Sequence, residues 1–237
     1  MKKVYLCSTM VLLLMSGIAH ADLTTIGTAT YNGADYKLIW DDDNNGNSVV
    51  WLDYSNAKAT WDDQIAWASS LNQANALTYN INPAYTVQWG TNSWRLPATV
   101  DQPFLNGYDG TTTGGYNVTS SEMGHLYYTE LGNLGMKDTS GNNQSEYGLK
   151  NTGSFDNLVA DSWYWSATEH NHDPFYDKVW SFNMQRGHQS IHRFKNSYGH
   201  GLAIRDAQVS AVPVPGAIWL VGAGVIALSG LGRRRAA

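Results

Sequence analysis

The chain is almost free of cysteine, because the only one among its 237 residues is Cys7. Cys7 lies inside an N-terminal apolar segment with the features of a secretion signal, well upstream of the expected cleavage site. A mature protein without cysteine forms no disulfide, carries no thiolate nucleophile and holds no cysteine-ligated metal. We therefore expect the exported part to be stabilised by its own hydrophobic core.

The N-terminal segment has a basic start at residues 2–3, a mostly apolar run over residues 4–18, and the small residues Ala19 and Ala21 in A-x-A spacing. This order is typical of a secretory signal that is cut after the second small residue. We expect residues 1–21 to direct export through the Sec machinery and to be removed by signal peptidase.

Basic residues are also scarce between the two ends of the chain. Five of the 15 Lys and Arg lie at residues 2–3 and 233–235, whereas all 20 Asp and Glu lie within residues 22–206, which therefore carry a net charge of −10. Because phosphate contacts need clustered Lys and Arg, we expect no nucleic-acid partner. Sulfated polymers are disfavoured unless basic residues gather locally, while divalent cations and neutral sugars remain compatible with this charge.

Charge is absent from residues 216–232, which are mostly apolar or small and are followed directly by Arg233, Arg234 and Arg235. As a helix this run spans roughly 25 Å, a minimal crossing of a hydrocarbon layer about 30 Å thick. We predict one transmembrane helix in the inner membrane, with the arginines in the cytoplasm and the domain outside. The alternative is a buried core helix.

The C-terminal tail carries a specific resemblance. Pro213 and Pro215 precede the apolar run, with Val214 between them, and the arginine cluster follows it. Residues 213–235 resemble a PEP-CTERM sorting signal of the Val-Pro-x-Pro subtype, in which Glu is commoner between the prolines. The resemblance implies processing by an exosortase, a membrane transpeptidase of Gram-negative bacteria that make exopolysaccharide, and delivery to the cell surface or extracellular matrix. An ordinary single-span anchor is the alternative.

Long helical patterns are rare in residues 22–206, which suit one exported domain. Residues 207–212 are predicted to form a short stalk of small residues between this domain and the tail. Nine of the ten Trp lie in the domain, which is also rich in Tyr, Asn and Gly, so most of it should be strand and loop. The clearest predicted strands cover residues 29–31, 36–40, 48–52 and 202–206, and residues 187–199 form a polar excursion before the last one.

Two amphipathic helices are predicted. Thr60 is a cap with Asp63 three residues later, and apolar positions continue to about Asn75. The second helix begins around Thr119. Its His125 has no acid or histidine at the spacing of a His-Glu-x-x-His motif, which favours a packed or surface histidine over a metal ligand.

The polar segment 41–47 matches the start of a calcium loop. Asp41, Asp43, Asn45 and Gly46 stand at loop positions 1, 3, 5 and 6, although the position of the bidentate Glu is taken by Leu52. Because the flanks resemble strands, an EF-hand is excluded. Calcium binding and a plain polar hairpin loop are the two alternatives.

Short motifs of the domain carry a second resemblance. They are Trp51–Asn56, Ser93–Pro97 (SWRLP), Ser121–Leu126, Trp163–Glu169 (WYWSATE) and Leu202–Asp206. Over roughly residues 50–206 they resemble the Lcl C-terminal-like family, earlier catalogued as domain of unknown function 1566. The resemblance implies a compact α+β domain similar to C-type lectin-like and formylglycine-generating-enzyme folds, with two helices and a twisted antiparallel sheet. The cysteines of the enzymatic members and the calcium signature of the lectins are absent here.

Four motif residues are candidates for ligand binding: Trp163, Trp165, Glu169 and Arg95. Aromatic faces beside polar groups suit stacking on sugar rings. The alternative places the Trp side chains in the core and pairs Arg95 with a core carboxylate such as Glu122 or Glu169.

Five of the seven His lie in residues 170–200. Imidazole and carboxylate groups are common metal ligands, and the alternative is a solvated loop that gains charge below about pH 6.5. The candidate ligands are His170, His172, Asp173, His188 and His192.

These features predict an exported, non-catalytic domain of the cell envelope or matrix that binds polysaccharide or a surface partner. No Ser-His-Asp motif, Gly-x-Ser-x-Gly motif or paired-carboxylate spacing is present, so we expect no enzyme and no cofactor, calcium apart. A secreted metal-dependent hydrolase using His and Asp, and a purely structural, self-associating matrix protein, are the alternatives.

Overall fold

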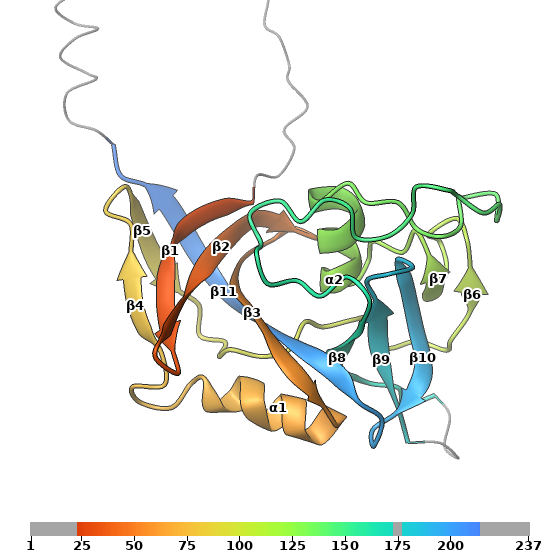
Figure 1. The fold of residues 1–237 in the computed structure, drawn as a ribbon, viewed down its shortest axis with the longest axis horizontal. Helices are drawn as coiled ribbons and strands as arrows, with labels where there is room; N and C mark the ends of the chain where they lie inside the picture. The colour runs from red at the N-terminus through yellow and green to blue at the C-terminus, as the bar shows by residue number, and fades with distance from the viewer. Residues whose placement is uncertain (1–22, 173–176, 214–237) are drawn as a thin grey trace, which may run out of the picture.

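The computed structural model describes residues 23–172 and 177–213, so the predicted signal peptide and transmembrane helix lie outside the described residues. Eleven strands and two short helices make up the described chain (Figure 1). The helices are α1 (Trp61–Ser70) and α2 (Glu122–His125), and α2 continues as one π-helical segment, η1 (Leu126–Glu130). The strands are β1 (Thr24–Tyr31), β2 (Ala34–Asn44), β3 (Asn47–Ala59), β4 (Thr78–Ile81), β5 (Tyr85–Trp89), β6 (Asn106–Gly107), β7 (Gly114–Tyr116), β8 (Trp163–Glu169), β9 (Lys178–Asn183), β10 (His188–Phe194) and β11 (Gly199–Ala211).

The strands form one twisted sheet in the order β4-β1-β2-β3-β11-β8-β9-β10-β7-β6, and β5 also pairs with β11. The predicted combination of two helices with a twisted sheet is observed, but the prediction of an antiparallel sheet is wrong. β11 enters between β3 and β8, antiparallel to the first and parallel to the second, and β6 is parallel to β7. The sheet is therefore mixed.

The central strands β2, β3 and β11 bury both of their faces, because successive side chains point to opposite sides of a strand. Leu38 pairs with Leu52 and Ile39 pairs with Trp51 in the β2–β3 register. The first pair belongs to one core and the second pair to another, and both cores are fully buried. Helix α1 contributes to the first core and α2 with η1 to the second.

Helix α1 begins where the sequence predicts. The Thr60 hydroxyl accepts from the Asp63 amide (3.3 Å) and donates to the Asp63 carboxylate (2.6 Å). The helix ends at Ser70 instead of near Asn75, because the Asn72 side chain binds the backbone of Trp94 through both its amide nitrogen and its oxygen. This contact ties the end of the helix to the SWRLP segment.

Helix α2 begins at Glu122, three residues after the predicted start. The Ser121 hydroxyl accepts from the Gly124 amide at 3.0 Å, as expected of a helix cap. The buried residues Met123, Leu126 and Tyr127 join the second core.

The polar segment 41–47 forms a tight hairpin. Only Asn45 and Gly46 lie between β2 and β3, and both have positive φ, 52° and 83°. An Asn-Gly pair favours this two-residue turn, whose twist matches that of the strands. The Asp43 carboxylate accepts from the Gly46 amide inside the turn, which fixes the shape of the hairpin.

Two predicted irregular segments are strands. The polar excursion at residues 187–199 contains β10, and the predicted stalk at residues 207–212 is mostly the end of β11, which pairs with β5 from Ala207 to Ala211. The stalk prediction is wrong because β5, which comes from another part of the chain, supplies a partner strand for residues 207–211. The stalk residues therefore belong to the domain.

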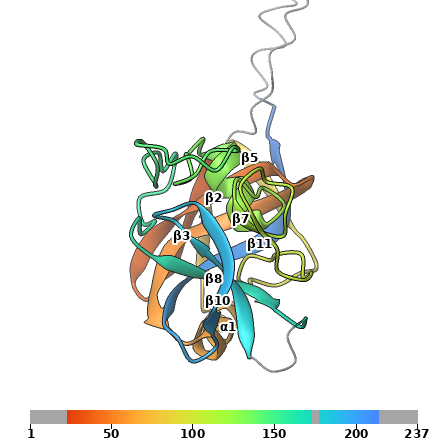
Figure 2. The same cartoon turned by 90° about the vertical axis from the view of Figure 1, so that its right-hand side faces the viewer.

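The two ends of the described domain leave it at the same side (Figures 1 and 2). Helix α1 and the turn between β10 and β11 lie at the opposite side in both views. The segment that precedes the sorting tail thus lies far from these two elements.

Candidate functional site

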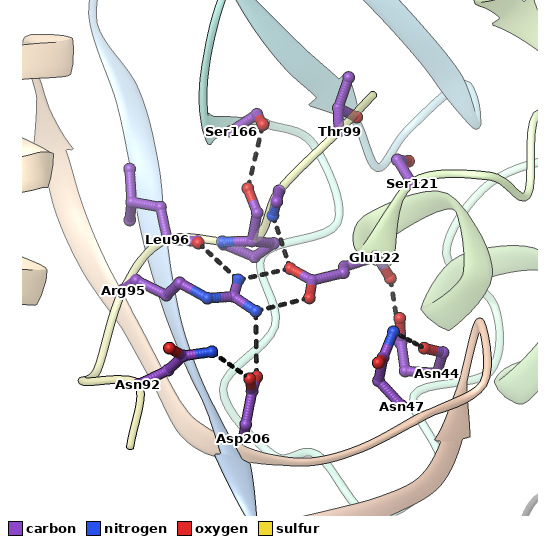
Figure 3. Close-up of polar contacts among 12 residues, drawn as sticks. Asn44, Asn47, Asn92, Arg95, Leu96, Thr99, Ser121, Glu122, Ser166 and Asp206 are labelled. Atoms are coloured by element: carbon purple, nitrogen blue, oxygen red, sulfur yellow. Dashed lines mark hydrogen bonds and ion pairs between the residues drawn. The ribbon is translucent and has the colours of Figure 1, made fainter. Parts of the chain in front are cut away.

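Arg95 forms a two-pronged ion pair with Glu122 at the centre of the motif residues (Figure 3). Its two terminal nitrogens donate to the two Glu122 oxygens at 2.6 and 2.7 Å, and one also donates to Asp206 at 3.2 Å. The Ala98 amide donates to the same Glu122 carboxylate. Burial opposes the charge of Arg95, but Glu122 and Asp206 outweigh it and raise its pKa.

The motifs meet around this pair. Arg95 and Ile204 exchange both backbone hydrogen bonds, at 3.0 and 2.9 Å. The Ser166 hydroxyl donates to the Pro97 carbonyl at 3.0 Å (Figure 3). Segments that lie far apart in sequence are thereby joined, so Arg95 is a structural residue, and the expected pairing with Glu122 is confirmed.

Of the motif tryptophans, Trp94 and Trp165 are core residues. Their ring nitrogens donate to the Tyr79 hydroxyl (2.8 Å) and to the Ala59 carbonyl (3.1 Å), which satisfies the polar end of each buried ring. Trp165, a candidate for ligand binding, therefore presents no exposed ring surface to a ligand. Trp163, at the start of β8, is only half-buried.

Glu169 lies at the other end of β8 and does not join the Arg95 network. Its carboxylate accepts from Lys195 at 2.8 Å, and Lys195 also faces Asp177 at 3.1 Å. The structure therefore separates three of the candidate ligand-binding residues: Arg95 at the motif junction, Glu169 at a surface ion pair and Trp163 at a cavity.

The cavity beside Trp163 has a volume of about 380 Å³. A second hollow of about 420 Å³ lies next to it and shares the lining residues Asp161 and Gln185. β3, β8, β9 and the turns on either side of β10 supply its walls. The Trp163 groove, as we name the first cavity, is lined by Lys58, Asp161, Ser162, Trp163, Asn183, Gln185, Arg186 and Tyr198.

The Trp163 groove combines flat rings with groups of each hydrogen-bonding type. Tyr198 is 63% exposed, unusually so for a large aromatic side chain. Carboxamides donate and accept, the Asp161 carboxylate accepts, and Lys58 and Arg186 only donate. Such a groove suits a ligand that presents hydroxyl groups at its edge and an apolar C–H face.

The Asn183 side chain helps to shape the groove. Its amide oxygen accepts from the Arg186 backbone amide at 2.8 Å, and its carbonyl accepts from Gly187 at 2.8 Å. Gly187 has a positive φ of 63°, and a Cβ added there would lie 2.5 Å from the Tyr128 hydroxyl oxygen, so a side chain has no room. The β9–β10 turn that carries Gln185 and Arg186 is therefore held in one shape.

The candidate metal ligands are divided between two places. His170 and His172 both face Asp101, at 3.4 and 3.6 Å, whereas His188 lies on β10 with its Nε2 3.1 Å from the Asn106 side chain. Within residues 23–172 and 177–213, no three His, Cys, Asp or Glu side chains are grouped to hold a metal ion.

The side chains of two further candidates lie outside the described part of the structure. Asp173 lies outside the described residues, and His192 is described only as part of the β10 backbone. The candidate ligands therefore remain candidates at two separate places, one beside Asp101 and one on β10.

Most residues of the Trp163 groove carry no local signal in the sequence. Asp161, Gln185 and Tyr198 stand in loops and turns without a motif, and only the fold brings them together. The sequence signal for this groove is Trp163, which stands in the WYWSATE motif.

A scan against protein-family models, a search of the curated proteins and a search of the solved structures each found no match. Of the helices in the described part of the chain, none has the length and apolar character needed to cross a membrane. The predicted span at residues 216–232 is outside that part.

Proposed function

We propose that the protein is an exported, non-catalytic binding domain of the cell envelope or extracellular matrix, and that the Trp163 groove holds a polysaccharide chain. The observation that carries the proposal is the pairing of Trp163 and Tyr198 with carboxamide and charged side chains in one open groove. Binding clefts of this kind combine aromatic surface with a few polar groups that set orientation. The lectin-like resemblance of the motifs supports the same class of function.

One end of the groove, at Tyr198, supports presentation away from a membrane. The β10–β11 turn, which carries Tyr198, lies opposite the side where both ends leave the domain (Figures 1 and 2). A domain tethered through its C-terminal tail would hold this turn toward the surroundings of the cell. Exopolysaccharide made by the same bacterium is the ligand that such a position favours.

Binding of glycans to the full chain tests the groove. The protein in mild detergent is applied to a glycan array and titrated with purified exopolysaccharide, with tryptophan fluorescence as the readout. We expect Trp163→Ala and Tyr198→Ala each to weaken binding at least about tenfold, as central aromatic contacts do. Tyr108→Ala, which removes another exposed tyrosine (42% exposed) outside the groove, is the matched control. Equal binding by all variants contradicts the proposal.

Export and sorting are tested separately. The intact mass and the cell fraction of the protein are measured in an exopolysaccharide-producing host with and without its exosortase. A species that has lost its tail and leaves the membrane only when exosortase is present supports the sorting signal formed by Pro213, Pro215 and residues 216–235. A full-length tail retained in the membrane of both strains contradicts it and leaves an ordinary anchor.

A further inference from the structure

A second group of polar side chains is buried where the β2–β3 hairpin packs on α2 and η1. Asp41 and Asn44 are completely buried, and the Glu130 side chain is 0% exposed. The Asn44 amide reaches the Glu122 carbonyl at 3.3 Å (Figure 3), which fixes the hairpin against the helix. Carboxylates are rarely buried to this extent without a partner.

The hydrogen bonds of this group leave three oxygens without a partner. One Asp41 oxygen accepts from Asn44 (2.8 Å) and from the Trp51 ring nitrogen (3.1 Å), and one Glu130 oxygen faces His125 (3.1 Å). The other Asp41 oxygen (Oδ1), the other Glu130 oxygen (Oε2) and the Asn44 oxygen (Oδ1) have none. Each such buried acceptor destabilises the fold unless a donor or a cation meets it.

His125 does not supply the missing partner. Its Nε2 faces Glu130 and its Nδ1 faces the Asn45 amide oxygen at 3.2 Å, so both ring nitrogens meet acceptors. The Asn45 orientation is set by its own amide, which donates to the Ser121 carbonyl. Burial lowers the pKa of His125, but Glu130 outweighs it and raises that pKa. Both ring nitrogens of His125 are occupied by these contacts, so the ring offers no donor to the free Asp41 oxygen.

The two carboxylates lie close enough to repel each other. Burial is the main cause that raises the pKa of Asp41 to about 6, and the charge of Glu130 adds to it. The π-helical turn explains how Glu130 reaches this place. It brings residues five apart onto one side of the helix, and such turns are frequent at functional sites.

We propose that Asp41 Oδ1, Asn44 Oδ1 and Glu130 Oε2 bind a calcium ion. The donor set is two carboxylates and one amide carbonyl, all oxygen, which Ca²⁺ prefers, and its flexible coordination tolerates further ligands from water. The site differs from the linear calcium loop suggested by the sequence. Asp43 is used in the turn and Asn45 binds His125, so neither is a ligand.

Terbium luminescence tests the site directly, because Tb³⁺ replaces calcium and is excited by a nearby indole. Trp51 is hydrogen-bonded to Asp41, so it is placed to sensitise the ion. With the full chain in mild detergent after chelator treatment, we expect saturable emission that calcium displaces, with an affinity of about 0.1–1 mM, as in other extracellular modules. Absence of saturable emission overturns the proposal.

Variants separate this site from the linear loop. We expect Asp41→Asn and Glu130→Gln each to weaken calcium binding at least about tenfold, whereas Asp43→Asn, an exposed acid of the same hairpin, leaves it unchanged. Loss of binding in Asp43→Asn, or full binding in Glu130→Gln, contradicts the assignment.

A measurement on the unaltered protein covers the case in which a variant fails to fold. Calcium that binds only the native state raises the melting temperature, and the rise grows with concentration. No rise in melting temperature with calcium, together with stabilisation by acid alone, shows that a shared proton occupies the site and overturns the proposal. These readouts are independent of the Trp163 groove, which contains none of the three ligands.

Discussion

The ion pair between Arg95 and Glu122 gives the sharpest stability prediction. Glu122→Gln keeps the shape of the side chain but removes its charge and turns one accepting oxygen into a donor. In the native protein the two oxygens accept from both Arg95 nitrogens and from the Ala98 amide, so the new NH₂ group faces another donor. The side chains are 13% (Glu122) and 30% (Arg95) exposed, so solvent replaces little of what is lost.

The expected loss follows from the number and burial of these contacts. Hydrogen bonds to charged groups contribute about 1.5–3 kcal/mol each, and breaking a buried ion pair on one side costs about 3–5 kcal/mol. Because Asp206 stays 3.2 Å from Arg95 and compensates part of its charge, we expect a loss at the lower end. Glu122→Gln should lower the free energy of unfolding by about 2–4 kcal/mol and the melting temperature by about 5–15 °C.

Guanidinium unfolding followed by tryptophan fluorescence measures this loss. Glu169→Gln is the matched control, since it neutralises a 43% exposed carboxylate that pairs with Lys195, and it should cost at most about 1 kcal/mol. If Glu122→Gln proves no more destabilising than Glu169→Gln, the Arg95 network does not hold the motifs together, and the argument made from it is refuted.

Two further predictions concern backbone shape and pH. Gly27→Ala should lower the free energy of unfolding by at least about 2 kcal/mol, because an added Cβ would lie 2.3 Å from the Asn80 carbonyl oxygen. Gly33→Ala, where nothing lies within 4 Å of an added Cβ, should lower it by only about 1 kcal/mol through left-handed backbone strain. Chemical unfolding measures both losses, and equal losses contradict this reading. Burial lowers the pKa of His200 below its ordinary 6.5 while its Nδ1 donates to the Asn56 carbonyl, so stability should fall as the pH drops from 6.5 through the lowered value. His200→Gln should flatten the melting temperature between about pH 7 and about pH 5, and an unchanged pH profile refutes this role.

Local sequence signals predicted the elements that depend on neighbours in the chain. Thr60 and Asp63 sit three residues apart and cap α1 as expected, and the Arg95–Glu122 pair was foreseen because a buried arginine needs a carboxylate. Strand lengths were underestimated. The ends of β10 and β11 are polar, and they become strands only because β9 and β5 supply hydrogen-bonding partners.

The sites depend on contacts that sequence spacing does not reveal. The His125–Glu130 contact was missed because an α-helix separates residues five apart, and only the π-helical turn brings them together. The Trp163 groove was half predicted: Trp163 stands in a recognisable motif, whereas Lys58 and Tyr198 come from a strand end and a turn that meet it through the fold. The calcium-like spacing drew attention to the hairpin that carries Asp41, but two of its positions, Asp43 and Asn45, are used in contacts within the turn and with His125.

The order of the strands also constrains how processing of the tail acts on the domain. β11 pairs with β3, β5 and β8 and ends at Ala211, and the Val212 amide donates to the Ala84 carbonyl at 2.8 Å. The sheet is therefore complete before Pro213. A cut at or beyond this residue removes none of these strand pairings, whereas a cut inside residues 207–211 takes away the partner of β5. If an exosortase acts on the tail as proposed, it would therefore release a domain whose sheet and Trp163 groove are complete.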